Sequence, residues 1–540
     1  MEKRQPNILF LIMDDTQKDC LGCYKGKGQV LTPNIDAIAR EGVRFERAYC
    51  SSTVCTPSRY SYLTGHYAGR NRHELFKRDN PDGEISKVNF NVAIDENVPN
   101  VLGLLNDAGY ETGYVGKYHC GRKLGELNIP KLAADADPYD PAVDQQIREL
   151  QAELQAELKR TTGVKHARSI AWGNIDEMPV RRLRYHHLEW MTQGALELLD
   201  TFDKERPFFL YYATSSFHGP LHHDSLRLGD PCLTWSGSDP ELAGLKEERQ
   251  QICEELEAAG LPINHQTVGA YWTDKEIGKV IAKLEQMGEL DNTLIVYASD
   301  HNVEPGKASC YEFGTRIPLI LRWPDGFGQG TVNHDYVQNI DLVPTLLEAA
   351  GVQPPSHMQL DGREIRGILE GEEKHRSLYF EMGFLRAVLM DEWKYISLRY
   401  PHRLTELAAK GELDKLPNHL DMPNQHQPYV TMDVFPHALD ADQLYDLRND
   451  PTEQCNLAAK PEHQQRLRIL QMELNSYLAT FPDHPYDLDD RRMFELPHFP
   501  ALKQRLLERG LGPVSWWSEE DSERAKERMP YILRATDPEV

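Results

Sequence analysis

Short apolar runs that end in polar residues organise the first 350 residues of the chain. Residues 7–13 form an uninterrupted apolar run, which is typical of a strand buried on both faces of a parallel sheet. Residues 208–212 and 293–298 have the same character. Shorter strands are expected at 43–48 and at 114–119, the second ending in His119.

Helical periodicity fills the stretches between these strands. Apolar residues recur at spacings of three and four over residues 98–109, 143–158, 188–202 and 277–284. We expect the amphipathic helix at 143–158 to lie on its own domain, with a lid or a subunit contact as the alternative. The alternation of strands and helices predicts an α/β domain with a large, doubly wound, mostly parallel sheet flanked by helices.

The pattern of hydrophobic and polar residues changes near residues 351–355. Shorter strand-like pieces and one helix follow, without long buried runs. We expect a smaller C-terminal α+β domain there. The predicted organisation is a catalytic α/β domain (1–370, with insertions at about 121–185 and 221–265), the smaller domain (371–482) and a polar, Pro-rich extension (483–540).

Composition limits the class of protein. The 540 residues carry a formal net charge of −24, with 40% hydrophobic and 27% charged residues, as in a soluble globular protein. This charge disfavours a surface that tracks nucleic-acid phosphates. No apolar run reaches the length of a membrane-spanning helix, and no secretory signal is evident. We expect a cytoplasmic protein as the sequence stands, or a periplasmic or secreted one if a signal has been removed.

The cysteines do not form a disulfide framework. There are nine, an odd number, scattered along the whole chain. Cys20 and Cys23 have a CxxC spacing, but no second pair lies nearby to complete a zinc site. We expect reduced thiols.

Acidic residues and one histidine follow two of the predicted strands. Asp14 and Asp15 come after the first strand, and Asp300 and His301 after the strand at 293–298. Open α/β sheets bind ligands beyond the carboxyl ends of their strands. Three carboxylates and an imidazole suit a divalent cation, and oxygen ligands favour calcium or magnesium over zinc. A pair of solvated turns is the alternative.

One stretch closely resembles the signature of a known family. Cys55 precedes Pro57-Ser58-Arg59, and Leu63-Thr64-Gly65 closes the segment. This pattern is similar to that of the formylglycine-dependent type I sulfatases, in the alkaline-phosphatase-like superfamily. The alternative is a buried structural thiol. Further segments resemble family landmarks: Gly116-Lys117-x-His119, His218 before a proline, Lys307 ahead of Tyr311-Glu312-x-Gly314-x-Arg316-x-Pro318, and Leu444 to Pro451.

The resemblance implies a site and its cofactors. Asp14, Asp15, Asp300 and His301, together with Cys55, would hold Ca²⁺, with Mg²⁺ or Mn²⁺ also possible. Cys55 would be oxidised to formylglycine by a formylglycine-generating enzyme or an anaerobic sulfatase-maturing enzyme. The hydrated aldehyde would then attack sulfur.

The resemblance also implies roles for the basic residues. Arg59 and Lys117 would hold the formylglycine and its ligands, and His119 would accept a proton. His218 and Lys307 would bind the sulfate and assist the leaving alcohol, with His218 as the general acid. A surface charge or a satisfied core histidine is the alternative for each.

One departure keeps a second activity open. His301 stands where the family often has Asn, and a histidine at this position is also seen in related phosphonate monoester hydrolases and phosphodiesterases. The run from Lys307 to Pro318 fits the sulfatase pattern better. We therefore expect a sulfatase acting on a small sulfated substrate, either a saccharide or another small alcohol, with phosphonate or phosphodiester hydrolysis as the alternative. An inert protein that keeps only the fold is the alternative from another class.

Substrate specificity is expected from the segments outside the resemblance, namely residues 121–185, 221–265, 400–440 and the tail. Candidates for contacting an anionic or hydroxylated substrate are Arg181, Arg182, Arg184, His186, His187, His222 and His223. A solvated surface is the alternative for each of them.

Overall fold

The computed structural model describes residues 4–26, 29–303, 305–327, 330–371, 376–412, 431, 434–497 and 499–500. The expected extension and one expected specificity segment are therefore only partly covered. Residues 501–540 and most of residues 413–433 lie outside the described residues.

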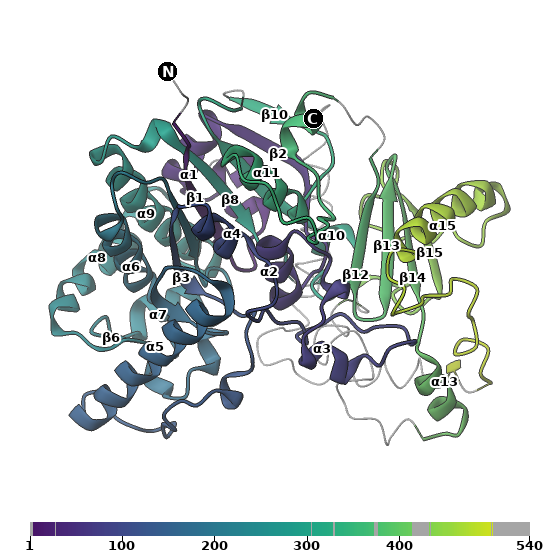
Figure 1. The fold of residues 1–540 in the computed structure, drawn as a ribbon, viewed down its shortest axis with the longest axis horizontal. Coiled ribbons are helices and arrows are strands. Elements are labelled where there is room, and N and C mark those ends of the chain that lie inside the picture. Colours follow the sequence, from purple (N-terminus) through teal and green to yellow (C-terminus); the bar gives the residue numbers. More distant parts are fainter. Residues whose placement is uncertain are drawn as a thin grey trace.

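A nine-stranded sheet forms the centre of the molecule (Figure 1). In spatial order its strands are β10 (Thr331–Asn333), β2 (Val43–Tyr49), β9 (Arg316–Arg322), β8 (Thr293–Ser299), β1 (Asn7–Met13), β5 (Phe208–Ala213), β3 (Glu111–Lys117) and β4 (His166–Ala171), with β11 (Val337–Gln338) beside β2. Neighbours run parallel except β9, which is antiparallel to β2 and to β8. The mostly parallel sheet predicted from the sequence is confirmed.

Apolar runs identified most of these strands. The run at 7–13 is β1, in which every residue is buried between two parallel neighbours. The expected strand at 114–119 ends earlier than predicted, because β3 stops at Lys117 and His119 has a positive φ of 52°. The strands β4 and β9 were not among the predicted ones.

The helices that contact one another form two groups (Figure 1). One group surrounds α9 (His265–Gln286) and contains α1 (Pro33–Arg40), α6 (Leu188–Thr201), α7 (His222–Leu228) and α8 (Leu245–Ala258). The other contains α2 (Cys55–Thr64), α4 (Val101–Asp107), α11 (Leu342–Ala349) and α12 (Ile365–Leu369). Shorter elements are α3 (Glu74–Asp79), α10 (Glu312–Thr315) and the hairpin of β6 (Leu233–Thr234) and β7 (Gly237–Ser238).

The amphipathic helix predicted at 143–158 is α5 (Pro141–Thr162), and it packs on β4. Its apolar stripe is buried in the main core, with Ile147, Leu150, Leu154 and Leu158 nearly inaccessible to solvent. Burying each such side chain contributes about 1.5–3 kcal/mol. The helix therefore lies on its own domain, as expected, and its stripe is not a free lid or subunit surface.

A second, antiparallel sheet follows in the chain. It contains β12 (Leu378–Met382), β13 (Leu385–Met390), β14 (Trp393–Leu398) and β15 (Asp442–Asp446), with α15 (Gln464–Leu478) packed on β13 and β14 and α13 (His402–Ala409) nearby in the sequence. This separate sheet confirms the smaller α+β unit. The limits predicted for it, 371–482, stay a prediction.

A buried ion-pair network joins this sheet to α10, the short helix that directly precedes β9 of the large sheet. Lys394 of β14 donates to Glu312 Oε1 at 2.9 Å and lies 3.7 Å from Glu453 Oε1. The carboxylate of Glu453 also accepts the Glu312 backbone N–H at 2.6 Å. All three side chains are buried.

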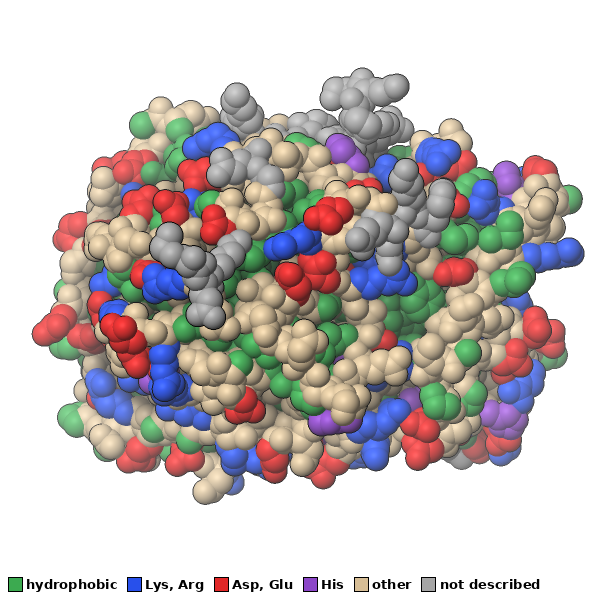
Figure 2. Space-filling view, turned by 45° about the horizontal axis from the view of Figure 1, so that its top comes forward, with side chains coloured by type: hydrophobic (Ala, Val, Ile, Leu, Met, Phe, Trp, Pro, Cys, Tyr) green, Lys and Arg blue, Asp and Glu red, His purple; other side chains and the backbone are tan. Residues whose placement is uncertain are grey.

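The molecular surface carries both signs of charge. On the face in Figure 2, acidic and basic side chains are interspersed and do not gather by sign. Among the described helices, none combines the length and apolar character needed to cross a membrane. All nine cysteines are free thiols, as predicted.

Candidate active site

Four neighbouring strands end at the same edge of the large sheet. β1 lies between β5 and β8, and β3 lies beyond β5. In the parallel register Met13 is opposite Ser299, and Ala213 is opposite both Ile12 and Gly116. The residues that follow these strands, or end them, are therefore brought together: Asp14 and Asp15, Asp300 and His301, Lys117 and His119, and His218.

Helix α2 places Cys55 at this edge. Cys55 is its first residue, and all ten residues of the helix are buried. Gly65, at the end of the matched signature, is the C-cap with a positive φ of 70°, a conformation that glycine adopts without strain. A Cβ at Gly65 would also meet Leu360 and Val343 at 2.8 and 3.0 Å. The closing glycine of the signature thus ends the helix that carries the cysteine.

Arg59 lies one helical turn after Cys55 and contacts both Asp14 and Asp300. It is fully buried, and its Nε donates to Asp300 Oδ2 at 3.0 Å. Its Nη2 is 3.4 Å from Asp14 Oδ1. The spacing of four residues puts the cysteine and the guanidinium on the same face of the helix.

Lys117 contacts both the acidic residues and the cysteine. Its Nζ donates to Asp14 Oδ2 at 2.5 Å and lies 3.5 Å from Cys55 Sγ. It also donates to Asn174 Oδ1 at 2.6 Å. Sequence reasoning missed Asn174, because a single asparagine inside an insertion belongs to no pattern.

Paired charges keep two of the buried acids ionised. Burial alone would raise the pKa of Asp14, but Lys117 and Arg59 hold it well below its ordinary value. Burial likewise opposes ionisation of Asp15, and the charge of Lys307 lowers its pKa. Burial raises the pKa of Asp300.

The geometry of four side chains fits a divalent cation. Ligand atoms of Asp14, Asp15, Cys55 and His301 lie within 4.8 Å of one another, and all four residues are buried. His301 Nε2 is 3.3 Å from Cys55 Sγ, and its Nδ1 is 3.2 Å from Asp15 Oδ1. Ionised carboxylates with an imidazole are a suitable donor set for such an ion.

Asp300 lies beside this group. Its Oδ1 accepts the backbone N–H groups of Asp15 at 3.1 Å and of His301 at 2.8 Å, and its Oδ2 accepts from Arg59. The structure therefore gives Asp300 contacts within the protein, and its predicted role as a metal ligand stays a prediction.

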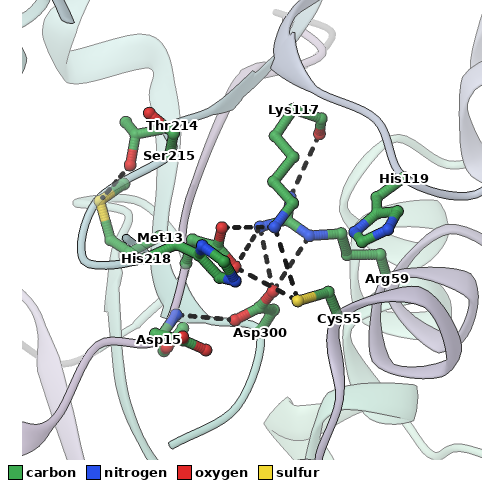
Figure 3. A network of polar contacts seen from close by, with 12 residues as sticks. Met13, Asp15, Cys55, Arg59, Lys117, His119, Thr214, Ser215, His218 and Asp300 are labelled. Carbon is green, nitrogen blue, oxygen red and sulfur yellow. Dashed lines mark hydrogen bonds and ion pairs between the residues drawn. The ribbon is translucent and has the colours of Figure 1, made fainter. Parts of the chain in front are cut away.

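The remaining residues predicted for the site are Lys307, His119 and His218. Lys307 Nζ contacts both carboxylate oxygens of Asp15, at 2.9 and 2.7 Å. In the view of Figure 3, Cys55 lies between His218 on one side and His119 on the other. Every residue predicted for the site is thus found in one cluster.

His119 is enclosed by neighbours. Its ring stacks on Phe90 with centroids 5.6 Å apart, and its Nε2 is 3.9 Å from Glu177 Oε1. Its Nδ1 is buried without a hydrogen-bond partner among the described residues. Burial and the charge of Lys117 hold the pKa of His119 well below its ordinary value, so the imidazole is neutral.

The thiol of Cys55 is a poor nucleophile as it stands. Burial raises the pKa of this thiol well above its ordinary value, although Lys117 acts in the opposite direction. A neutral thiol attacks far more slowly than a thiolate.

Three of the residues expected to contact substrate are instead buried in the protein core. His186, His187 and His222 are buried and make hydrogen bonds within the protein, so neither substrate contact nor a solvated surface describes them. Histidines in a polar stretch suggested a surface, but all three are core residues. Arg182, in contrast, pairs with Asp137 at an exposed position.

Known proteins with similar sequences and folds are sulfatases and their relatives. The sequence model of the family named Sulfatase matches residues 6–352. An N-acetylglucosamine-6-O-sulfatase of Bacteroides thetaiotaomicron is 24% identical over 579 aligned residues, which cover 92% of this chain and 90% of that protein. Human arylsulfatase A is 26% identical, with 87% of each chain covered.

Solved structures share the fold at lower identity. One was determined with its substrate D-glucosamine-2-N,6-O-disulfate. It is 20% identical, covers 90% of this chain and 100% of its own, and superposes with a TM-score of 0.57. The phosphonate monoester hydrolase of Agrobacterium radiobacter is 18% identical, covers 88% and 96%, and has a TM-score of 0.55. These likenesses support the fold alone, whereas the family match spans the strands and the helix that build the site. The chain belongs to the sulfatase family and is a sulfuric ester hydrolase.

Proposed function

We propose that this protein hydrolyses the sulfate ester of a carbohydrate, with formylglycine made from Cys55 as the nucleophile. One observation carries the proposal. Cys55 Sγ lies 3.3 Å from His301 Nε2, 3.5 Å from Lys117 Nζ and 3.6 Å from Asp14 Oδ1. The side chain of residue 55 is thus surrounded by metal-binding groups and cations, as a nucleophile for an anionic ester requires.

The carbohydrate part of the proposal is supported by related proteins. Two related proteins of Bacteroides thetaiotaomicron are named as 6-O-sulfatases of N-acetylglucosamine and N-acetylgalactosamine, and a solved structure of the same fold holds a disulfated glucosamine. The segment around Asn174 lies at the site and can contribute to selection among such sugars.

Asp14, Asp15, Asp300 and His301 would hold a divalent cation, which we take to be Ca²⁺ with Mg²⁺ or Mn²⁺ as alternatives, since carboxylate oxygens suit these hard cations. The formylglycine hydrate would supply the attacking oxygen, and the ion would supply positive charge beside it. Lys117 and Arg59 keep Asp14 ionised and in place. Together these residues form a buried network of ion pairs next to residue 55.

The histidines divide the proton transfers. His119 has a neutral imidazole with an unpartnered Nδ1, so it can accept a proton near residue 55. We assign His218, on the opposite side of Cys55, as the proton donor to the leaving alcohol. Lys307 adds a positive charge that attracts the anionic ester.

Peptide mass spectrometry on Cys55 tests the nucleophile. After expression with a formylglycine-generating or an anaerobic sulfatase-maturing enzyme, the peptide should carry the aldehyde in place of the thiol. Cys55→Ala should lose turnover and keep its melting temperature to within a few degrees, since the change removes one buried sulfur. Undiminished hydrolysis by Cys55→Ala would place the nucleophile elsewhere.

Initial rates on a panel of substrates test the ester class. Sulfated mono- and disaccharides, nitrophenyl sulfate and a phosphonate monoester would be compared with the matured enzyme. We expect the highest kcat/KM on a sulfated saccharide. A higher value on the phosphonate, which His301 keeps in consideration, would replace the proposed activity by phosphonate hydrolysis.

A further inference from the structure

Three histidines from separate elements have their rings in contact next to the loop that carries His218. His186 precedes α6, His222 begins α7 and His265 begins α9. The rings of His186 and His222 are stacked, with centroids 4.2 Å apart, and the centroids of His222 and His265 are 4.8 Å apart. His186 and His222 are buried, and His265 is half-buried. We call these three residues the histidine cluster.

The histidine cluster forms hydrogen bonds with the loop that carries His218, residues 214–221 between β5 and α7. His186 Nε2 is 2.9 Å from the carbonyl oxygens of both His218 and Pro220. His186 Nδ1 is 2.8 Å from Ser215 Oγ. A carbonyl oxygen only accepts, so His186 Nε2 carries the hydrogen and Nδ1 accepts from the serine hydroxyl. One neutral imidazole thus holds three polar groups within six residues of the loop.

The other two histidines hold the middle of the same loop. His265 Nε2 donates to Phe217 O at 3.0 Å, which leaves its Nδ1 as an acceptor facing His222 Nδ1 at 3.1 Å. The same Nδ1 of His265 accepts the backbone N–H of His222 at 3.1 Å, and His222 Nε2 is 3.3 Å from Ser216 Oγ. Thr273 donates in turn to Ser216 Oγ at 2.7 Å. Every ring nitrogen has a partner when all three imidazoles are neutral.

The opposite side of the loop is fixed to the metal-binding strand end. Asp14 N–H donates to Ser216 O at 2.6 Å, and Phe217 N–H donates to Asp14 O. The loop is therefore held between the backbone of Asp14 and the histidine cluster. His218 comes directly after the two residues held on both sides, so its place relative to residue 55 depends on these contacts.

We propose that the histidine cluster positions His218 for proton donation to the leaving alcohol, with His186 as its main positioning residue. The inference rests on the proposed function, in which His218 is the proton donor. His186 has no role in contacting substrate or cation. It acts through the carbonyl groups of His218 and Pro220.

Leaving-group dependence separates positioning from general stability. A proton donor matters for a leaving group that needs a proton and matters little for a good leaving group such as nitrophenolate. His186→Ala should therefore lower kcat/KM on a sulfated N-acetylhexosamine by at least about 10-fold, and on nitrophenyl sulfate by less than about 3-fold. His218→Ala should show the same pattern with a larger effect.

A conservative substitution at His186 and a double variant with His218 make the test more specific. Gln at position 186 can donate from an amide nitrogen near the place of Nε2, so His186→Gln should recover kcat on the sugar sulfate to within about 3-fold. Adding His186→Ala to His218→Ala should cost less than about 3-fold more. His187→Ala is the matched control, because His187 is buried beside His186 but bonds Pro231 O. It should leave the ratio of the two substrates unchanged.

The outcomes distinguish the two proposals. Equal losses on both substrates in His186→Ala, or no loss on either, would overturn the positioning role while wild-type sulfatase activity stands. A wild type that hydrolyses neither sulfate would overturn both proposals. Should His186→Ala not fold, the same ratio is measured in His265→Ala, which removes a half-buried ring and the bond to Phe217 O.

Discussion

Asn174 Oδ1 accepts a hydrogen bond from Lys117 Nζ at 2.6 Å, across 57 residues of sequence. The same ammonium donates to Asp14 Oδ2 and lies beside Cys55 Sγ. The asparagine comes from the predicted insertion, whereas Lys117, Asp14 and Cys55 come from the segments that resemble the family. A segment outside those motifs therefore takes part in orienting the lysine nearest to the nucleophile.

Removing this acceptor should impair catalysis more than folding. Asn174→Ala leaves Lys117 with one acceptor fewer in a buried site, and we expect kcat to fall by about 10-fold, since a hydrogen bond to a charged group contributes about 1.5–3 kcal/mol. Asn174→Asp keeps an acceptor at the same position and should fall less. Steady-state kinetics on nitrophenyl sulfate would measure both, and an unchanged kcat in Asn174→Ala would contradict the role.

Breaking the buried ion-pair network between β14 and α10 should destabilise the protein. Lys394→Met takes from the buried Glu312 carboxylate the cation at 2.9 Å and leaves Arg316 at 4.0 Å; breaking a buried pair in this way typically costs about 3–5 kcal/mol. Burial raises the pKa of Glu453 to about 8, so Glu312 is the acid that carries the charge near neutral pH. Urea unfolding would give the free energies. The exposed Lys460→Met is the control and should stay within about 0.5 kcal/mol; a similar value for Lys394→Met would refute the argument.

Stability should depend on pH through His186. Burial lowers the pKa of His186 to about 3 from an unfolded value of 6.5, although its hydrogen bonds to the carbonyl oxygens of His218 and Pro220 act in the opposite direction. The folded state therefore binds fewer protons, so this contribution is present above pH 6.5 and is lost as pH falls towards 3. Between pH 7 and pH 5 it amounts to about 2 kcal/mol. Urea unfolding of His186→Gln should show a drop smaller by that amount, and equal drops would contradict the assignment.

A divalent cation should stabilise the folded chain. Adding Ca²⁺ to chelator-treated protein should raise the free energy of unfolding by about 3 kcal/mol when the free ion reaches roughly 100 times its Kd. Asp15→Asn removes a charged ligand and should abolish most of the rise. Asp140→Asn, at the exposed start of α5, should keep it. Calorimetric scans with and without the ion would measure the effect, and a rise retained in Asp15→Asn would place the ion elsewhere.

The strand ends could be predicted because two simple regularities coincide there. A strand buried on both faces must be continuously apolar, as β1 and β8 are, and parallel strands end at a common edge. Asp14 and Asp300 could therefore be placed together from the sequence. The motif around Lys307 came from the resemblance to the family, since its place beside Asp15 follows from tertiary packing.

Other parts of the site could not be predicted for physical reasons. Helix α2 is buried all round, so its residues show no apolar stripe to mark them as helical. His186 and His222 lie in polar stretches, and only their mutual contacts in the fold place them in the core. Asn174 has no partner nearby in the sequence, and its role depends entirely on where the chain returns to Lys117.

The position of β1 has a consequence for how the protein is synthesised. β1 leaves the ribosome before its neighbours β5 and β8, and Asn7 pairs with Thr293. The two edges of β1 are therefore both paired only after β8 has been synthesised, about 290 residues later in the chain. Closing such long loops is slow, and the uncovered strand is prone to misassociation meanwhile. The site that β1 anchors is thus completed late, after the residues that follow β8 have been made.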